Sequence, residues 1–194
     1  MTKDITPEAF YDALSLAHKL DAYLDGFKRE EIHLFSFFSS LLYLYAGNTI
    51  GDWPHRYIVN NGYPYSDIID ETITRHIQNG LFEENGDFLV ITGRGTDEFG
   101  KFKNLLTFKK REEFLEAACT TSLLVPYSQT LRALLSEPEM KNIESINSGS
   151  WLEGTRIYPK FKEIIEAVGV QAQDLIIPAV TWINYLNEQE KLRN

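Results

Sequence analysis

Apolar residues recur at helical spacing near the start of the chain and predict two long helices. The first begins after Thr6, a hydroxyl N-cap followed by proline at the first helical position, and it ends near Gly26. The second covers residues 28–46, where a charged start is followed by a stretch that is apolar nearly all round. A helix of that kind is buried on most sides, so we expect it at the centre of the core.

The pattern changes over residues 65–92, which predict a helix, a glycine stop and two short strands in succession. Isoleucines form one stripe of the helix, and Ser66 is placed to cap it. Residues 81–84 and 87–92 then read as strands that pair through Asn85-Gly86, a dipeptide typical of tight hairpin turns. This stretch therefore predicts a small β-hairpin directly after a helix.

Shorter apolar runs, bounded by glycine, proline and asparagine, predict the remaining elements. Residues 143–154 are rich in Ser, Asn and Gly and predict a linker. The other expected elements are a short strand at residues 49–53, a short helix at 54–60, and helices at 99–107, 111–118, 128–135, 158–168 and 174–192.

A helix, Gly-Leu-Phe, an acidic turn and a strand ending in Thr-Gly follow one another over residues 65–93. This order resembles the last helix and the wing of winged helix-turn-helix domains, and the resemblance covers residues 28–106. In size and acidity the chain is similar to the accessory winged-helix subunits of SMC-type complexes. The segment at residues 54–60 departs from the pattern, because it is shorter than the helix usually found there.

The resemblance implies a mainly α fold with a small β-hairpin wing, in which a winged-helix core carries helical N- and C-terminal extensions. A helical protein with an incidental β-hairpin is the alternative fold. The implied division is an N-terminal helix at residues 1–27, a winged-helix domain with following helices at 28–142, a linker at 143–154 and a C-terminal helical segment at 155–194.

Charge on the helix and the wing argues against the usual DNA-binding mode. DNA-binding members of the superfamily place the second helix of the motif in the major groove, where phosphates require cations. Here Arg75 is the one base expected on the exposed face of that helix, and the wing has no Lys or Arg. The acids form either a docking face for another protein or an ordinary solvated surface. They are Asp67, Asp70, Glu71, Glu83, Glu84 and Asp87.

A basic cluster without acids follows the wing at residues 100–111. Aromatic residues are interleaved with its lysines, a combination that can track a nucleic-acid backbone or dock an acidic partner. Alternatively the aromatic side chains belong to the core and the lysines to a solvated helix edge. The candidate binding residues are Arg75, Arg94, Lys101, Lys103, Lys109, Lys110 and Arg111.

The composition of the chain limits its expected ligands and its expected cellular compartment. The formal net charge of −9 argues against non-specific binding to nucleic acid or to an anionic membrane. The single cysteine, Cys119, excludes an intramolecular disulfide and suits a reducing compartment. The N-terminus lacks the basic flank and apolar run of a signal peptide, and the apolar run at residues 34–46 is too short to span a membrane. We therefore expect a cytoplasmic protein without a membrane contact.

The sequence predicts no catalytic residue, no metal site and no cofactor. Gly93-Arg94-Gly95 lacks the Gly-Lys-Ser/Thr ending of a phosphate loop. The four histidines are scattered, and none has a second ligand at zinc-like spacing. Cys119 lies on an apolar-faced helix, where a buried inert thiol is the usual case. We therefore predict a protein that is not an enzyme.

Together these patterns predict a protein-interaction subunit of a larger, DNA-acting complex that contains an ATPase or an SMC-type component. Another protein subunit is the expected partner, since the chain has more Tyr and Trp residues than one small core accommodates. The alternative is a winged-helix transcriptional regulator. Such a regulator would contact DNA through residues 101–111 and form a homodimer through its terminal helices.

Overall fold

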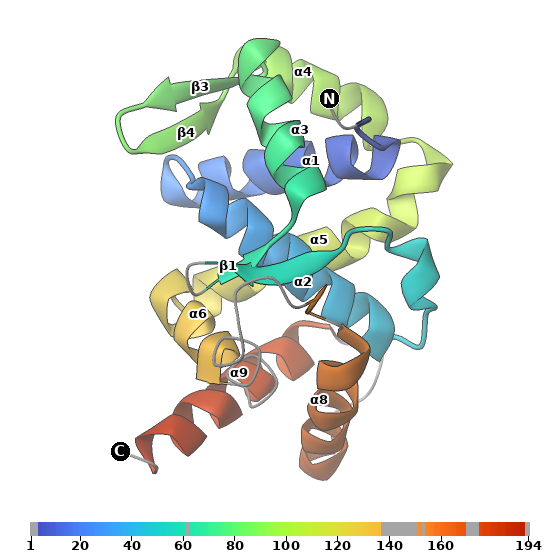
Figure 1. Cartoon of the computed structure of the whole chain (residues 1–194), viewed down its shortest axis with the longest axis vertical. Helices are drawn as coiled ribbons and strands as arrows, with labels where there is room; N and C mark the ends of the chain where they lie inside the picture. Colours follow the sequence, from blue (N-terminus) through green and yellow to red (C-terminus); the bar gives the residue numbers. More distant parts are fainter. Residues whose placement is uncertain (1–3, 61–62, 137–150, 153, 170–174, 193–194) are drawn as a thin grey trace.

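The computed structural model describes residues 4–60, 63–136, 151–152, 154–169 and 175–192. The fold is mainly helical with small antiparallel sheets, as predicted, and its layout is shown in Figure 1. The helices are α1 (Pro7–Leu24), α2 (Arg29–Tyr45), α3 (Asp67–Gln78), α4 (Gly93–Phe102), α5 (Leu106–Leu124), α6 (Tyr127–Ser136), α8 (Gly154–Val168) and α9 (Ile176–Lys191). The strands are β1 (Tyr57–Asn60), β2 (Tyr63–Tyr65), β3 (Phe82–Asn85), β4 (Phe88–Ile91) and β5 (Trp151–Leu152).

The two predicted N-terminal helices form the centre of the core. Thr6 caps α1, with its Oγ1 accepting a hydrogen bond from the Ala9 amide at 3.1 Å. The helix ends where Asp25 turns left-handed at φ 58° and Gly26 follows at φ 125°, a conformation that suits glycine. Every residue of α2 from Glu31 to Tyr45 is buried, which confirms its predicted central position.

The prediction for residues 49–60 is wrong in both parts. Ile50–Asp52 form a short 3₁₀ helix (η1) in place of a strand, and the expected short helix is β1. In β1, Tyr57 and Val59 are buried, whereas Ile58 and Asn60 are only partly covered. Aromatic and β-branched residues that alternate in burial favour a strand, and this two-residue period prevails over the helical interpretation.

The hairpin forms as predicted, with a shift of one residue in its turn. Strands β3 and β4 pair from Phe82–Ile91 to Asn85–Phe88, so the two turn residues are Gly86 and Asp87. Gly86 has a φ of 63°, which tight hairpin turns require at this position. The chain between α1 and α2 adds a third, minimal strand, because the backbones of Phe27 and Leu89 exchange two hydrogen bonds.

Helix α4 starts at Gly93, earlier than predicted, and the expected helix at residues 111–118 belongs to the longer α5. Thr92 caps α4 by accepting a hydrogen bond from the Gly95 amide at 3.0 Å. The short connection between α4 and α5 forms a corner of the molecule, far from the hairpin (Figure 1).

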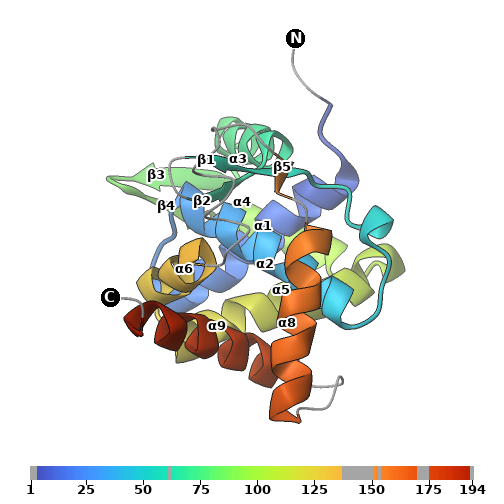
Figure 2. The ribbon, with the colours of Figure 1, turned by 60° about the horizontal axis from the view of Figure 1, so that its bottom comes forward.

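The C-terminal helices lie on the other side of α2 from the hairpin. Helices α8 and α9 pack against each other, and α9 also packs against α5 and α6 (Figure 2). The predicted linker at residues 143–154 lies mostly outside the described residues. At its end, Trp151–Leu152 pair with β1 as β5 instead of forming a loop, and α8 begins at Gly154.

Candidate interaction surfaces

The acids of α3 are largely paired within the chain. Asp70 accepts a hydrogen bond from Arg29 at 3.1 Å, and the His33 ring approaches the same carboxylate at 3.7 Å. His33 and Arg29 lower the pKa of Asp70. Glu71 forms an ion pair with Arg75 at 3.1 Å, one helical turn away. Much of the acidity predicted for this helix is therefore compensated locally.

The acids of the hairpin are not compensated. Glu83, Glu84 and Asp87 are exposed, and within the described part of the chain none of them forms an ion pair or hydrogen bond through its side chain. The hairpin extends to one side of the molecule, where the backbone of Phe27 pairs with Leu89 of β4 (Figure 1). Glu83 and Glu84 are neighbours in β3 and point to opposite faces of the hairpin, and Asp87 lies at its turn, so the hairpin is negative on both faces and repels phosphate.

Apolar side chains lie beside these carboxylates. Phe88, at the start of β4, is 47% exposed, and Leu24, at the end of α1, is 43% exposed. Gly26 brings the two elements together, since a Cβ on it would lie 3.4 Å from the Phe88 Cβ. The Lys28 ammonium lies 5.0 Å from the centre of the Phe88 ring, so the ring already takes part in a cation–π contact. We call this group the hairpin end; it comprises Leu24, Glu83, Glu84, Asp87 and Phe88.

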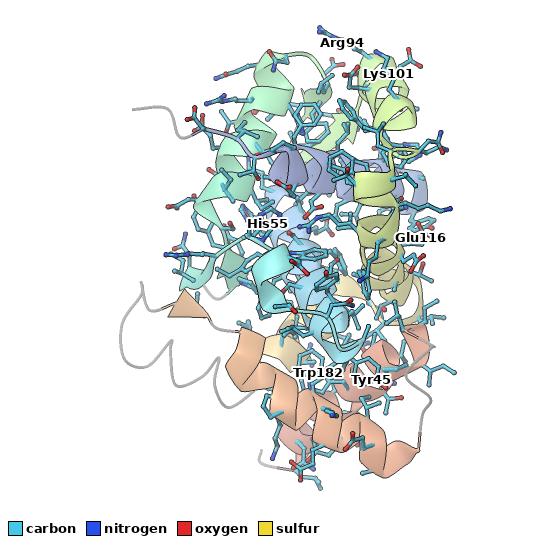
Figure 3. All side chains as sticks on the ribbon, turned by 90° about the vertical axis from the view of Figure 1, so that its right-hand side faces the viewer. Tyr45, His55, Arg94, Lys101, Glu116 and Trp182 are labelled. Atoms are coloured by element: carbon cyan, nitrogen blue, oxygen red, sulfur yellow. The ribbon has the colours of Figure 1, made fainter. Side chains whose placement is uncertain are left out.

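The predicted basic residues do not form one surface. Arg75 pairs with Glu71, and Arg94 donates to the Asn79 carbonyl at 2.9 Å, close to the end of α3. Figure 3 shows Arg94 and Lys101 at the same extremity of the molecule. Lys101 pairs with Glu98 at 2.7 Å. These contacts leave fewer cations available than the sequence suggested.

Exposed cations lie at the corner between α4 and α5. Lys103 and Lys109 are exposed, and neither forms an ion pair with any residue that the structure describes. Lys110 contacts Asn48 at 2.5 Å and lies 5.5 Å from the Tyr43 ring centre. Phe99 and Phe108 are buried beneath them, so these aromatic side chains belong to the core and do not form a stacking platform for bases.

Arg111 is not a surface residue, and its assignment as a binding candidate is wrong. Its guanidinium is buried and forms a bidentate ion pair with the fully buried Asp12. The Nε–Oδ1 distance is 2.5 Å and the Nη2–Oδ2 distance is 2.6 Å. His55 Nε2 lies 2.8 Å from Asp12 Oδ2 and 3.1 Å from Arg111 Nη2. We call these three residues the buried clasp; Figure 3 shows His55 inside the molecule.

The clasp joins three separate segments of the chain. Asp12 comes from α1, Arg111 from α5 and His55 from the segment before β1. Arg111 also donates to the Asp52 carbonyl at 3.3 Å, and its Cζ lies 3.6 Å from the centre of the Trp53 ring. Burial alone would raise the pKa of Asp12, but Arg111 and His55 outweigh it and lower that pKa, so the carboxylate stays charged.

A second polar cluster, also absent from the predictions, lies between α1 and α5. Glu112 accepts hydrogen bonds from Tyr11 at 2.6 Å and Ser15 at 2.7 Å, and its other oxygen pairs with Lys19 at 2.6 Å. Lys19 also pairs with Glu116. Burial opposes the charge of Lys19, but the two glutamates raise its pKa. Two carboxylates share one ammonium group, and the Tyr11 and Ser15 hydroxyls donate to the Glu112 oxygen that does not contact Lys19, so the cluster joins the two helices.

The cysteine and three of the histidines, His33, His55 and His76, are buried. Cys119 is fully buried, which raises the pKa of its thiol and keeps it protonated. His76 is buried against Phe10 and Phe82, and desolvation lowers its pKa to about 4. Across the described ranges, no group of three or more His, Cys, Asp or Glu side chains is placed to hold a metal ion. In the same ranges, no helix is both long and apolar enough to cross a membrane.

The chain was compared with known proteins. No family model, no curated protein and no solved structure matches it. The inference of function therefore rests on the two exposed surfaces, the hairpin end and the α4–α5 corner.

Proposed function

We propose that this chain is a non-enzymatic protein-interaction subunit of a larger complex, and that it docks through its hairpin end. The observation that carries the proposal is the combination of three uncompensated carboxylates with the half-exposed Phe88 and Leu24. Protein interfaces use aromatic anchors surrounded by polar groups, whereas a DNA surface needs cations. A partner surface that is basic and carries an apolar pocket fits this end.

The fold supports the proposal by analogy. The order α2, α3, β3 and β4, with the Phe27 bridge on β4, resembles a winged-helix domain in which the hairpin is the wing. Such domains serve both as DNA readers and as accessory subunits of SMC-type or other ATPase complexes. The uncompensated acids on the wing favour the second role for this chain, and the partner class is proposed on that basis.

The test is purification of the tagged chain from its native cells under mild conditions. We expect one partner to remain bound at unit stoichiometry, and Phe88→Ser with Glu83→Lys and Glu84→Lys to abolish its retention. All three positions are exposed or half-exposed, so the variant keeps its fold. Lys103→Glu with Lys109→Glu is the matched control and should retain the partner. A chain that purifies alone at every salt concentration would contradict the proposal.

The second candidate function is DNA binding, and exposed Lys103, Lys109 and Lys110 favour it. In that case the isolated protein binds duplex DNA with an affinity that falls steeply with salt, because each phosphate contact releases a counterion. Lys109→Glu with Lys110→Glu would abolish this binding. Fluorescence anisotropy with a labelled duplex at two salt concentrations decides between the functions, and we expect no salt-dependent binding.

A further inference from the structure

The α4–α5 corner exposes two leucines at its tip. Leu105 is 47% exposed at the residue before α5, and Leu106 is 87% exposed at the first residue of that helix. Two adjacent leucines in water are unfavourable, and exposed apolar side chains surrounded by polar ones commonly mark an interaction surface. The core does not require them, since buried Phe99 and Phe108 already fill the space beneath the corner.

Cations surround these leucines. Lys103 precedes them and Lys109 follows them, both exposed and both without an ion pair to the described residues. Lys101 lies at the end of α4, where Glu98 neutralises part of its charge. The corner therefore combines an apolar tip with positive charge, and it fits an acidic surface that offers an apolar side chain.

The hairpin end of the same chain has that chemistry. It presents Glu83, Glu84 and Asp87 beside the half-exposed Phe88 and Leu24. Figures 1 and 2 place the hairpin and the α4–α5 corner on opposite sides of the molecule. One copy therefore cannot bring its own two surfaces together, but two copies can.

We propose that the chain self-associates head to tail, with the hairpin end of one copy docked on the α4–α5 corner of the next. Phe88 and Leu24 contact Leu105 and Leu106, while Glu83, on the Phe88 face of the hairpin, and Asp87, at its turn, face Lys103 and Lys109. Because the two surfaces differ, each contact leaves one hairpin end and one corner free, so the assembly extends instead of closing as a two-fold dimer. This inference rests on the proposed function in one respect, that the hairpin end docks on protein; a hairpin end that holds the partner subunit cannot hold a second copy at the same time.

A phosphate backbone is a poorer occupant of the corner. Electrostatic contact with DNA uses the lysines but gains nothing from Leu105 and Leu106, which would remain in water. The second copy covers both the leucines and the charges. Its net charge of −9 weakens the association at long range, so the attraction is local and the affinity modest.

Sedimentation velocity of the purified full chain over a concentration series is the first test. We expect the mean sedimentation coefficient to rise with concentration without reaching a dimer limit. Raising the salt from about 0.1 M to about 1 M shortens the Debye length from about 10 Å to about 3 Å and should weaken the association at least tenfold. A monomer at every concentration, or a dimer that saturates, would overturn the head-to-tail arrangement.

Mixing two disabled variants is the decisive test. One variant carries Glu83→Lys and Glu84→Lys at the hairpin; the other carries Leu105→Ser and Leu106→Ser at the corner. Each should be monomeric alone, with a dissociation constant raised at least about tenfold by loss of its anchor. When mixed, the intact corner of the first binds the intact hairpin of the second, and association stops at a one-to-one complex. A symmetric interface would not be rescued by mixing.

Two controls distinguish self-association from a different ligand at the corner. Leu124→Ser, at an unrelated leucine that is 61% exposed, should leave self-association unchanged. If the corner variant instead loses binding to duplex DNA or to vesicles of anionic lipid, while the wild-type chain is monomeric, the corner serves that ligand and self-association is overturned. Retention of a native partner by such a monomeric chain would leave the proposed function intact and reject this inference alone.

Discussion

Lys109 and Arg111 lie two residues apart on α5, yet one belongs to an exposed corner and the other to the buried clasp. Lys109 has no ion pair among the described residues, whereas Arg111 is held by Asp12 on two sides. The difference is set by the helical period, since Arg111 shares the inward stripe of Phe108 and Leu115. Neighbours in a basic run therefore lie in opposite environments, and only for the buried one is removal of the charge partner expected to cost much stability.

The two regions also differ in how well their charges are matched. In the clasp and in the cluster around Lys19, each buried charge has an opposite charge within hydrogen-bond distance. At the hairpin end and the α4–α5 corner, carboxylates and ammonium groups face water without partners among the described residues. Unmatched exposed charges add little to folding, so those at the two ends are available for binding.

The largest expected effect comes from breaking the clasp. Asp12→Ala leaves the Arg111 guanidinium buried without its carboxylate, and we expect a loss of about 3–5 kcal/mol in the free energy of unfolding. Urea denaturation followed by circular dichroism measures this loss. Asp12→Leu combined with Arg111→Met removes both charges and should recover much of the stability. Equal destabilisation by the single and double variants would contradict an ionic clasp.

Acidification should lower the free energy of unfolding through the buried side chain of His76. Its pKa is lowered from 6.5 to about 4 in the folded chain, so the unfolded chain binds the proton more readily. The contribution of neutral His76 is fully present above pH 6.5 and is lost as the pH falls towards 4. The loss amounts to about 3 kcal/mol, at 1.36 kcal/mol for each pH unit.

The measurement for His76 is the free energy of unfolding at several pH values between 7.5 and 4. His76→Gln retains a donor for the Phe10 carbonyl but does not titrate, so its stability should fall less steeply over this range. Identical slopes for the wild-type chain and the variant would show that His76 is not the titrating group.

The packing of α4 against the hairpin predicts a smaller effect on stability. Gly95, on α4, packs so closely against the hairpin that an added Cβ would lie 2.7 Å from Ile91 Cγ1 and still closer to the Leu81 carbonyl. Gly95→Ala should therefore cost about 1–3 kcal/mol by overpacking. Gly100→Ala is the matched control on the same helix, where nothing lies within 4 Å of an added Cβ. The control should be neutral or stabilising by up to about 1 kcal/mol in thermal melts.

The exposed surfaces should show the smallest effect on folding. Glu83→Gln, Glu84→Gln and Lys109→Gln should each change the free energy of unfolding by no more than about 0.5 kcal/mol. Glu83→Gln and Glu84→Gln should weaken binding to a partner, and Glu83→Gln and Lys109→Gln should weaken binding to a second copy. A loss of several kcal/mol in stability from any of them would remove the distinction between the buried clasp and the exposed ends.

Periodicity predicted most of the helices and the hairpin because these are local features. Thr6, Ser66 and Gly80 mark helix boundaries, and the Asn-Gly dipeptide lies at the hairpin turn, within one residue of its true position. The secondary structure of residues 54–60 was harder to predict, because so short a segment after Pro54 fits either a helix or a strand. Its pairing with β2 and with the distant β5 decides between them, and no local pattern reports that pairing.

The candidate surfaces were predicted in part. The hairpin acids are exposed as the sequence indicated, because consecutive polar residues at a turn have little chance of burial. The exposed leucines of the corner and the buried clasp were missed. The position of Arg111 on the inward stripe of α5 was a usable signal, but Asp12 and His55 lie far away in the chain, so their meeting required the fold.

By itself the sequence determined the helix order, the acidic hairpin and the burial of α2, because each follows from local periodicity, capping and turn chemistry. The tertiary structure decided which charged side chains are buried in ion pairs and which remain exposed. That outcome depends on long-range packing: α1, α5 and the segment before β1 meet around Asp12, Arg111 and His55. Among the described residues, uncompensated charges remain exposed at the hairpin end and at the α4–α5 corner.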